Sequence, residues 1–242
     1  TMRVIKIGGG CLNGKKTINT ITGLLAHRGR GNVIVVSALK GVTDSLIEGM
    51  QLALADEAGI PGIMTAYQSC HTDVARHLIK DKNALRQTSK TLSRAFSQLE
   101  RLFYGLSFTR EITPRLYDTI VSFGERTCAQ LLAAVMESRG VTAVSAMPHE
   151  AGLITDGKFG DATADLKAST ANFNQHLRPL INRDRIVFMP GCYGVGRNGD
   201  ITTFGRGGSD YSAAVAAAAL GADRLEIWKD VDGFMSADPR VV

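Results

Sequence analysis

RVIKIGGGCLNGKK, residues 3–16, begins as a short apolar run and passes at Gly8 into three successive glycines. Glycine lets backbone N–H groups approach an anion closely. Lys6, at the end of the apolar run, can bridge the oxygens of a phosphoryl group during its transfer. The same residues also suit a tight strand-to-helix turn with a surface lysine, so both interpretations stay open at this point.

The stretch also contains an incomplete P-loop. Counted from Gly9, the spacing G-x-x-x-x-G-K is complete at Gly14 and Lys15. Lys16 follows, where that motif requires a Ser or Thr hydroxyl for Mg²⁺. The stretch is therefore either a damaged P-loop or a different phosphate site built on the three glycines.

Continuous apolar runs recur along the chain and indicate strands that are covered on both faces, as in a parallel sheet between helices. The runs are residues 2–7, 32–37, 141–146, 185–191 and 224–230. Helical stretches at residues 17–27, 125–140 and 209–222 separate them, and the last two contain Gly140 and Gly221 at C-cap positions. We therefore predict an α/β fold, a three-layer α/β/α sandwich with a mainly parallel central sheet.

Two segments depart from this alternation. Residues 46–115 are predicted to form a long helical insertion, which Pro61 and Gly62 interrupt and the T-P-R of residues 113–115 closes. Residues 194–200, GVGRNGD, are typical of a hairpin turn. A chain of 242 residues with 44% hydrophobic side chains can form one large α/β domain or two smaller ones.

Charge and cysteine content exclude several classes of protein. The net charge of +5 suits an acidic substrate or nucleotide, but the basic residues are dispersed, so no nucleic acid is expected as partner. Four cysteines without a C-x-x-C pair indicate inert thiols in a reducing cytoplasm. The chain lacks an 18-residue apolar run and a charged-then-apolar leader, so we expect neither a membrane span nor a signal peptide.

Two further stretches carry polar residues where ligands bind in α/β proteins. In SALKGVT, Ser37 and Thr43 follow a predicted strand, at the edge where open sheets bind ligands. In SFGERTC, Glu125 is predicted to lie in the first turn of a helix, where the macrodipole favours an acid. Ordinary helix capping and an ordinary acidic helix residue explain these patterns equally well.

The stretch TTFGRGGSDY, residues 202–211, gives the strongest signal. Three glycines surround Arg206 and lead into an alanine-rich helix that begins near Ser209 and Asp210. Backbone amides, a guanidinium and a helix N-terminus therefore converge on a site for a small anion such as a carboxylate. Further on, Asp230, Asp232 and Asp238 could hold Mg²⁺ directly or through water, although Asp-Gly and Asp-Pro also form ordinary turns.

In this order the motifs resemble the aspartate kinases of the amino-acid kinase superfamily, over nearly the whole chain. KIGGGC is similar to that family's K-F-G-G-T-S, and SALKGVT, TPR, GER and GLITD match further motifs. TTFGRGGSDY and IWKDVDGFMSADPR resemble T-T-L-G-R-G-G-S-D-Y and W-T-D-V-D-G-x-x-x-x-D-P-R. The resemblance implies the carbamate kinase-like fold and places the phosphate element at Lys6, so the near P-loop is accidental.

The resemblance implies phosphorylation of the side-chain carboxylate of L-aspartate by Mg-ATP, giving 4-phospho-L-aspartate for lysine, threonine and methionine synthesis. Lys6 would stabilise the γ-phosphoryl group, Asp210 would organise the centre, Glu125 would take the substrate ammonium and Arg206 its α-carboxylate. The positions implied for substrate binding are Ser37, Thr43, Glu125, Arg206, Gly207, Gly208 and Ser209. Those implied for nucleotide binding are Lys6, Gly8, Gly9, Lys229, Asp230, Met235 and Arg240. No residue is assigned as a dedicated metal ligand.

Some features depart from the family pattern. Gly10 and Cys11 replace a Thr and a Ser, and Met235 replaces the usual aromatic residue. The sequence stops at Val242, before a segment with a second phosphate-contacting lysine and before the regulatory ACT domains. We therefore expect a C-terminally truncated catalytic domain without feedback inhibition.

Within this domain, residues 1–184 would form a substrate-binding lobe and residues 185–242 an incomplete nucleotide-binding lobe. A regulatory domain or chain would supply the missing part, and a homodimer stays open. The alternatives are a kinase for glutamate or N-acetylglutamate, and a non-catalytic binding subunit or fragment.

Overall fold

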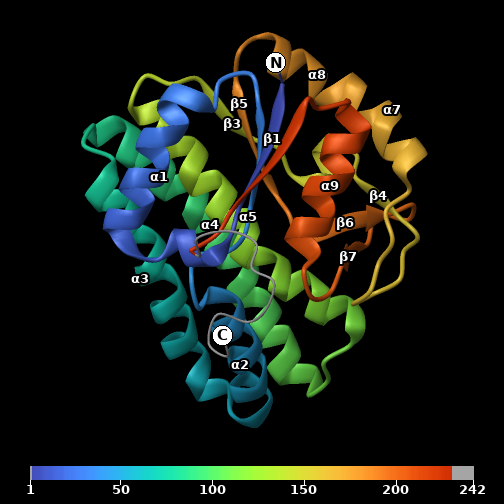
Figure 1. Ribbon diagram of the computed structural model, residues 1–242. Coiled ribbons are helices and arrows are strands. Elements are labelled where there is room, and N and C mark those ends of the chain that lie inside the picture. The colour runs from blue at the N-terminus through green and yellow to red at the C-terminus, as the bar shows by residue number, and fades with distance from the viewer. Residues whose placement is uncertain (1, 231–242) are drawn as a thin grey trace, which may run out of the picture.

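In the computed structural model, which describes residues 2–230, five parallel strands form the central sheet (Figure 1). Their order across the sheet is β3-β5-β2-β1-β8, and each neighbouring pair is parallel. The strands are β1 (Arg3–Ile7), β2 (Val33–Val36), β3 (Ala143–Ser145), β5 (Ile186–Pro190) and β8 (Arg224–Trp228). All five apolar runs are therefore strands, as predicted.

Different helices cover the two faces of this sheet. Along β1, Ile5 and Ile7 belong to one buried cluster and Val4 to another, because successive side chains point to opposite faces. Helices α1 (Gly14–Arg28) and α5 (Pro114–Ser138) contribute to the first cluster, and α7 (Leu166–His176), α8 (Arg178–Asn182) and α9 (Gly208–Leu220) to the second. Figure 1 shows α1 and α9 on opposite sides of the strands. The predicted three-layer sandwich is confirmed.

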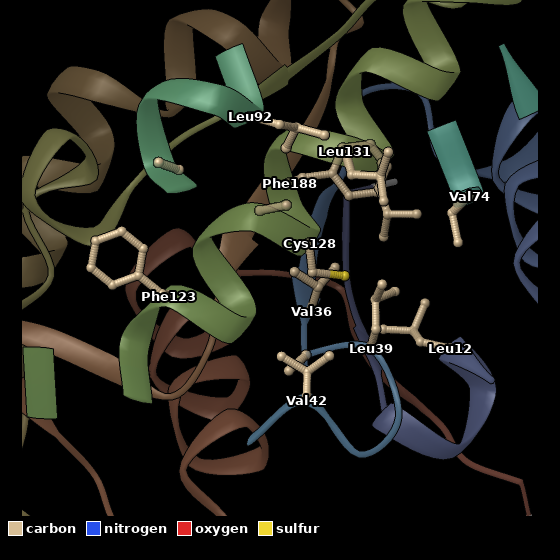
Figure 2. Packing of buried hydrophobic residues seen from close by; sticks show 14 of the residues in the cluster. Leu12, Val36, Leu39, Val42, Val74, Leu92, Phe123, Cys128, Leu131 and Phe188 are labelled. Carbon is tan, nitrogen blue, oxygen red and sulfur yellow. The ribbon is translucent and has the colours of Figure 1, made fainter. Parts of the chain in front are cut away.

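The predicted helical insertion consists of three helices packed against α5. They are α2 (Val42–Ala55), α3 (Ile60–Leu78) and α4 (Lys82–Thr109), with the short 3₁₀ turn η2 (Glu57–Gly59) before α3. Pro61 lies in the first turn of α3, where a missing N–H costs nothing. Figure 2 shows Val74 of α3 and Leu92 of α4 in the same buried cluster as Cys128 and Leu131 of α5. Burial raises the pKa of the Cys128 thiol, and all four cysteines are free.

A second, smaller sheet lies beside α9 in the described chain (Figure 1). Its strands are β4 (Ile154–Thr155), β6 (Tyr193–Gly196) and β7 (Ile201–Thr203). β6 and β7 are antiparallel and joined by a turn with Gly199 at φ +89°, which confirms the hairpin predicted at residues 194–200. The remaining short elements are η1 (Gly9–Leu12) and α6 (Pro148–Ala151).

The position of Glu125 within its helix differs from the prediction. Thr113 caps α5 by accepting a hydrogen bond from the Leu116 N–H, and Pro114 occupies the first turn. Because α5 continues to Ser138, Glu125 lies near its middle, and the predicted first-turn position was wrong. Thr113 and Pro114 mark the end of the insertion, as predicted, but they also form the start of α5. The second role was not predicted.

A buried histidine makes the insertion sensitive to pH. His71 of α3 has no exposed surface; its Nδ1 lies 2.8 Å from the Tyr67 carbonyl oxygen and its Nε2 3.0 Å from Thr127 Oγ1 of α5. Burial lowers the pKa of His71 to about 4, from an ordinary value of 6.5. The folded protein therefore binds fewer protons than the unfolded chain between these two pH values, and its stability falls as the pH falls through this window.

We expect this histidine to cost roughly 3 kcal/mol of unfolding free energy between pH 6.5 and 4. Urea unfolding of the wild type and of His71→Gln at several pH values measures the effect, because glutamine stays neutral throughout. His77, exposed on the same helix, provides the matched control as His77→Gln. An unchanged pH dependence in His71→Gln would contradict the prediction.

Candidate active site

A cavity of about 610 Å³ opens at the carboxyl ends of the central strands. Elements far apart in the sequence meet there: the end of β1, the loop after β2, the middle of α5 and the start of α9. Nine of the residues implied by the family resemblance line it, namely Lys6, Ser37, Thr43, Glu125, Arg206, Gly207, Gly208, Ser209 and Asp210. This edge is where open α/β sheets bind ligands.

A charge network joins β1 to the first turn of α9. The Lys6 side chain, only 7% exposed, points to the α9 face of the sheet, and its Nζ lies 2.8 Å from Asp210 Oδ1. Lys229, which follows β8, lies 3.2 Å from Asp210 Oδ2. Partial burial alone would raise the pKa of Asp210, but hydrogen bonds from both lysines outweigh this and hold the pKa below its ordinary value. The centre therefore combines one fixed carboxylate with two ammonium groups.

Glu125 is a buried carboxylate held by three donors from the opposite wall. Its Oε2 accepts hydrogen bonds from the N–H groups of Gly191 (2.6 Å) and Cys192 (2.5 Å), and its Oε1 accepts one from Ser209 Oγ (2.8 Å). Burial raises the pKa of Glu125, although these donors and the Cys192 thiol lower it. A carboxylate has about four acceptor positions, so Oε1 can accept from one group besides Ser209, and the Cys192 thiol is the protein group that competes for it.

The start of α9 supplies hydroxyl and N–H groups beside Glu125. Gly207, with φ +77°, precedes the helix, and Ser37 Oγ lies 3.3 Å from Ser209 Oγ. Gly191 lets β2 and the start of α9 both pack closely against the backbone at residue 191. A Cβ there would lie 2.6 Å from a Val35 side-chain atom and 2.8 Å from Ser209 Cβ. The helix N-terminus and its glycines thus lie at the cavity, and the small-anion site there stays a prediction.

The predicted nucleotide residues are only partly described. The Gly8 N–H donates to the Trp228 carbonyl (2.9 Å), which ties the glycine turn to β8. A Cβ added at Gly10 would overlap the Asp230 carboxylate. The position of Asp230 in this structure therefore requires a glycine at residue 10, where the family pattern has Thr. Predictions for Asp232, Met235, Asp238 and Arg240 fall outside the described residues.

The cavity also contains residues that the sequence interpretation missed. These are Asp44, Ile47, Tyr117, Val121, Gly160, Cys192, Thr203 and Gly205. Tyr117, Val121 and Glu125 are spaced i, i+4, i+8 on α5, so they share one helix face. The spacing would have revealed this face if the start of the helix at Pro114 had been recognised.

The described part of the chain lacks two other kinds of feature. Within residues 2–230, no three His, Cys, Asp or Glu side chains are grouped so that they could hold a metal ion. No helix of that region is long and apolar enough to cross a membrane.

The chain is similar to known proteins in sequence and in fold. The model of the amino acid kinase family matches residues 1–242. The chain belongs to this family. As a family member it is 40% identical over 147 residues to an aspartate kinase of Pseudomonas fluorescens, covering 60% of this chain and 34% of that protein. It is also 28% identical to aspartokinase 1, chloroplastic, of Arabidopsis thaliana, over 98% of this chain and 42% of the relative.

Solved structures of related kinases have the same fold. Aspartokinase III of E. coli in complex with aspartate and ADP matches with a TM-score of 0.87 at 28% identity, over all of this chain and 52% of that one. The same enzyme with lysine and aspartate matches with a TM-score of 0.86. This amino acid kinase chain thus spans between a third and about half of the length of these relatives.

Proposed function

We propose that this protein transfers the γ-phosphoryl group of ATP to the side-chain carboxylate of L-aspartate, giving 4-phospho-L-aspartate. One observation carries the proposal: a single cavity brings together the Lys6–Asp210 pair, the Glu125 carboxylate and the Arg206 turn. The structural match to an aspartokinase that holds aspartate and ADP supports it further.

The amino-acid substrate would be bound between α5 and the start of α9. The open acceptor position on Glu125 Oε1 suits its ammonium group, because a buried carboxylate gains most from an opposite charge nearby. Arg206 is exposed at the cavity and can pair with the α-carboxylate in a bidentate fashion. With both ends held, the side-chain carboxylate of the substrate is left to face the phosphoryl donor.

Lys6 and Lys229 would neutralise the phosphoryl group in transfer. An oxygen of the aspartate side chain forms a bond to the γ-phosphorus, the bond to the β,γ-bridging oxygen breaks, and ADP leaves with that electron pair. The attacking carboxylate is already ionised at neutral pH, so no general base is required. The work of the protein is positioning and charge neutralisation, for which Asp210 holds the two lysines in place.

Magnesium fits this site as a companion of the nucleotide. Mg²⁺ typically binds one or two carboxylates together with substrate phosphates, and Asp210 offers a partly exposed carboxylate beside the cavity. The residues described contain no larger acidic cluster that would hold a resident metal. When bound, Mg²⁺ would neutralise phosphate charge.

The test is an ADP-release assay with Mg-ATP and L-aspartate, run beside L-glutamate and N-acetyl-L-glutamate. We expect turnover that depends on L-aspartate and is absent with the longer acceptors. Turnover with either of these would contradict the proposed substrate. Silence with all three, from a folded protein, would contradict the activity and favour a non-catalytic binding subunit.

A further inference from the structure

A second buried carboxylate of α5 lies two turns before Glu125. Asp118 is 1% exposed, and its partners are donors from two other segments. Its Oδ2 accepts hydrogen bonds from the N–H groups of Gly160 (2.9 Å) and Thr203 (2.8 Å), and its Oδ1 accepts one from the Thr203 hydroxyl (2.8 Å). An ionised carboxylate only accepts hydrogen bonds, so a single group can satisfy all three donors.

Both segments form part of the cavity wall. Gly160 and Thr203 line the cavity, and β7 ends at Thr203, three residues before Arg206. The Ala162 N–H donates to the Thr203 carbonyl (2.9 Å), which joins the two segments directly. Asp118 therefore anchors the strand end from which the Arg206 turn extends.

The Arg206 turn is also in close backbone contact with the Gly160 turn. Gly205 has φ +72°, and a Cβ there would lie 2.9 Å from the Gly160 carbonyl oxygen. A continuous chain of contacts thus runs from Asp118 through Gly160 and Gly205 to Arg206. The Arg206 side chain itself is exposed, so its direction depends on where this turn holds the backbone.

We propose that Asp118 is a positioning residue that fixes the Arg206 turn and so sets the affinity for the α-carboxylate of the amino-acid substrate. The inference rests on the proposed function for its substrate. Asp118 itself does not touch the substrate: its effect passes through Gly160, Thr203 and Gly205. A carboxylate suits this place because its two oxygens can accept from all three converging donors.

Binding calorimetry with L-aspartate and with ADP tests the proposal in Asp118→Ala and Asp118→Asn. In Asp118→Ala we expect at least a tenfold weaker affinity for L-aspartate and an affinity for ADP within twofold of the wild type. Asp118→Asn should recover most of the loss, because its amide oxygen can accept from both N–H groups and its NH₂ can donate to the Thr203 hydroxyl. A purely structural role predicts equal losses for both ligands, and that result would overturn the proposal.

Glu137→Ala is the matched control. Glu137 is a carboxylate of the same helix that accepts a hydrogen bond from the Ala143 N–H (2.6 Å), and it lies outside the cavity lining. Its removal should leave both affinities unchanged. If Asp118→Ala fails to fold, Thr203→Val removes one of the three donors and should still weaken L-aspartate binding selectively.

Amide hydrogen exchange separates failure of this inference from failure of the proposed function. Asp118→Ala should speed exchange at Gly160 and over residues 203–208, whereas Glu137→Ala should not. Unchanged exchange at 203–208 in Asp118→Ala would overturn the positioning role whatever the ligand. A wild type that binds no L-aspartate would instead refute the proposed function, and the exchange result would still decide the role of Asp118.

Discussion

Lys6→Ala is expected to abolish phosphoryl transfer while leaving the protein folded. Lys6 is 7% exposed and its Nζ lies 2.8 Å from Asp210 Oδ1, so the ammonium group is fixed before any substrate arrives. Loss of one preorganised group that stabilises transition-state charge typically lowers kcat by about 10²–10³-fold. We expect at least this loss, measured as aspartate-dependent ADP release at saturating substrates. The Tm should change little, because Lys229 still pairs with Asp210.

The neighbouring lysines give the control for this prediction. Lys15 and Lys16 belong to the incomplete P-loop but are exposed on α1. Alanine at either position should leave kcat and nucleotide affinity as in the wild type. Loss of ATP binding in Lys16→Ala, with Lys6→Ala still active, would restore the P-loop interpretation.

The parallel sheet could be predicted from the sequence because it depends on a local property. Runs such as VIVV in β2 are apolar at every position, as a strand buried on both faces requires, and their β-branched residues favour a strand over a helix. The order of strands depends instead on crossovers that no single segment encodes. β8, the last described strand, pairs with β1 along its whole length, and nothing in either stretch indicated this pairing.

Candidate site residues could be predicted where the local sequence itself is unusual for an ordinary strand, turn or helix. A lysine at the end of a buried strand and three glycines around Arg206 both cost stability, so these two stretches indicated a site, and the family resemblance then favoured a site over an ordinary turn. Asp118 had no such signal, because its donors come from segments 42 and 85 residues away. Glu125 was indicated by its motif, but its hydrogen-bond partners were not, because Gly191 follows β5 and Ser209 lies on α9, far from α5 in the sequence.

Glu125→Gln is expected to remove recognition of the substrate ammonium while retaining the fold. The glutamine oxygen can still accept from the Gly191 and Cys192 N–H groups, and its NH₂ can donate to Ser209 Oγ. It offers no negative charge to an ammonium group, however. Loss of a buried charge pair typically costs about 3–5 kcal/mol, so we expect L-aspartate affinity to fall by at least roughly 100-fold.

Glu125→Ala should show how much the hydrogen bonds of the Glu125 side chain contribute to the stability of the fold. It removes the acceptor of the buried Cys192 N–H, and an unsatisfied group of this kind costs about 1–3 kcal/mol. The Gly191 N–H keeps the Val36 carbonyl as an acceptor (3.2 Å), and the Ser209 hydroxyl keeps Ser37 Oγ at 3.3 Å. We therefore expect a clear loss of unfolding free energy in urea for Glu125→Ala and a much smaller one for Glu125→Gln. The glutamine variant is thus the one in which ligand affinity can be interpreted.

Succinate, which is aspartate without its amino group, separates the two possible roles of Glu125. The wild type should bind L-aspartate much more tightly than succinate, because only aspartate brings a cation to the open position on Oε1. In Glu125→Gln this preference should disappear, through loss of aspartate affinity with succinate affinity little changed. The wild-type preference should also weaken as the pH falls through the raised pKa of Glu125, since protonation removes the same charge. Equal preference for aspartate in both proteins would mean that Glu125 only positions the start of α9, and that another group holds the ammonium.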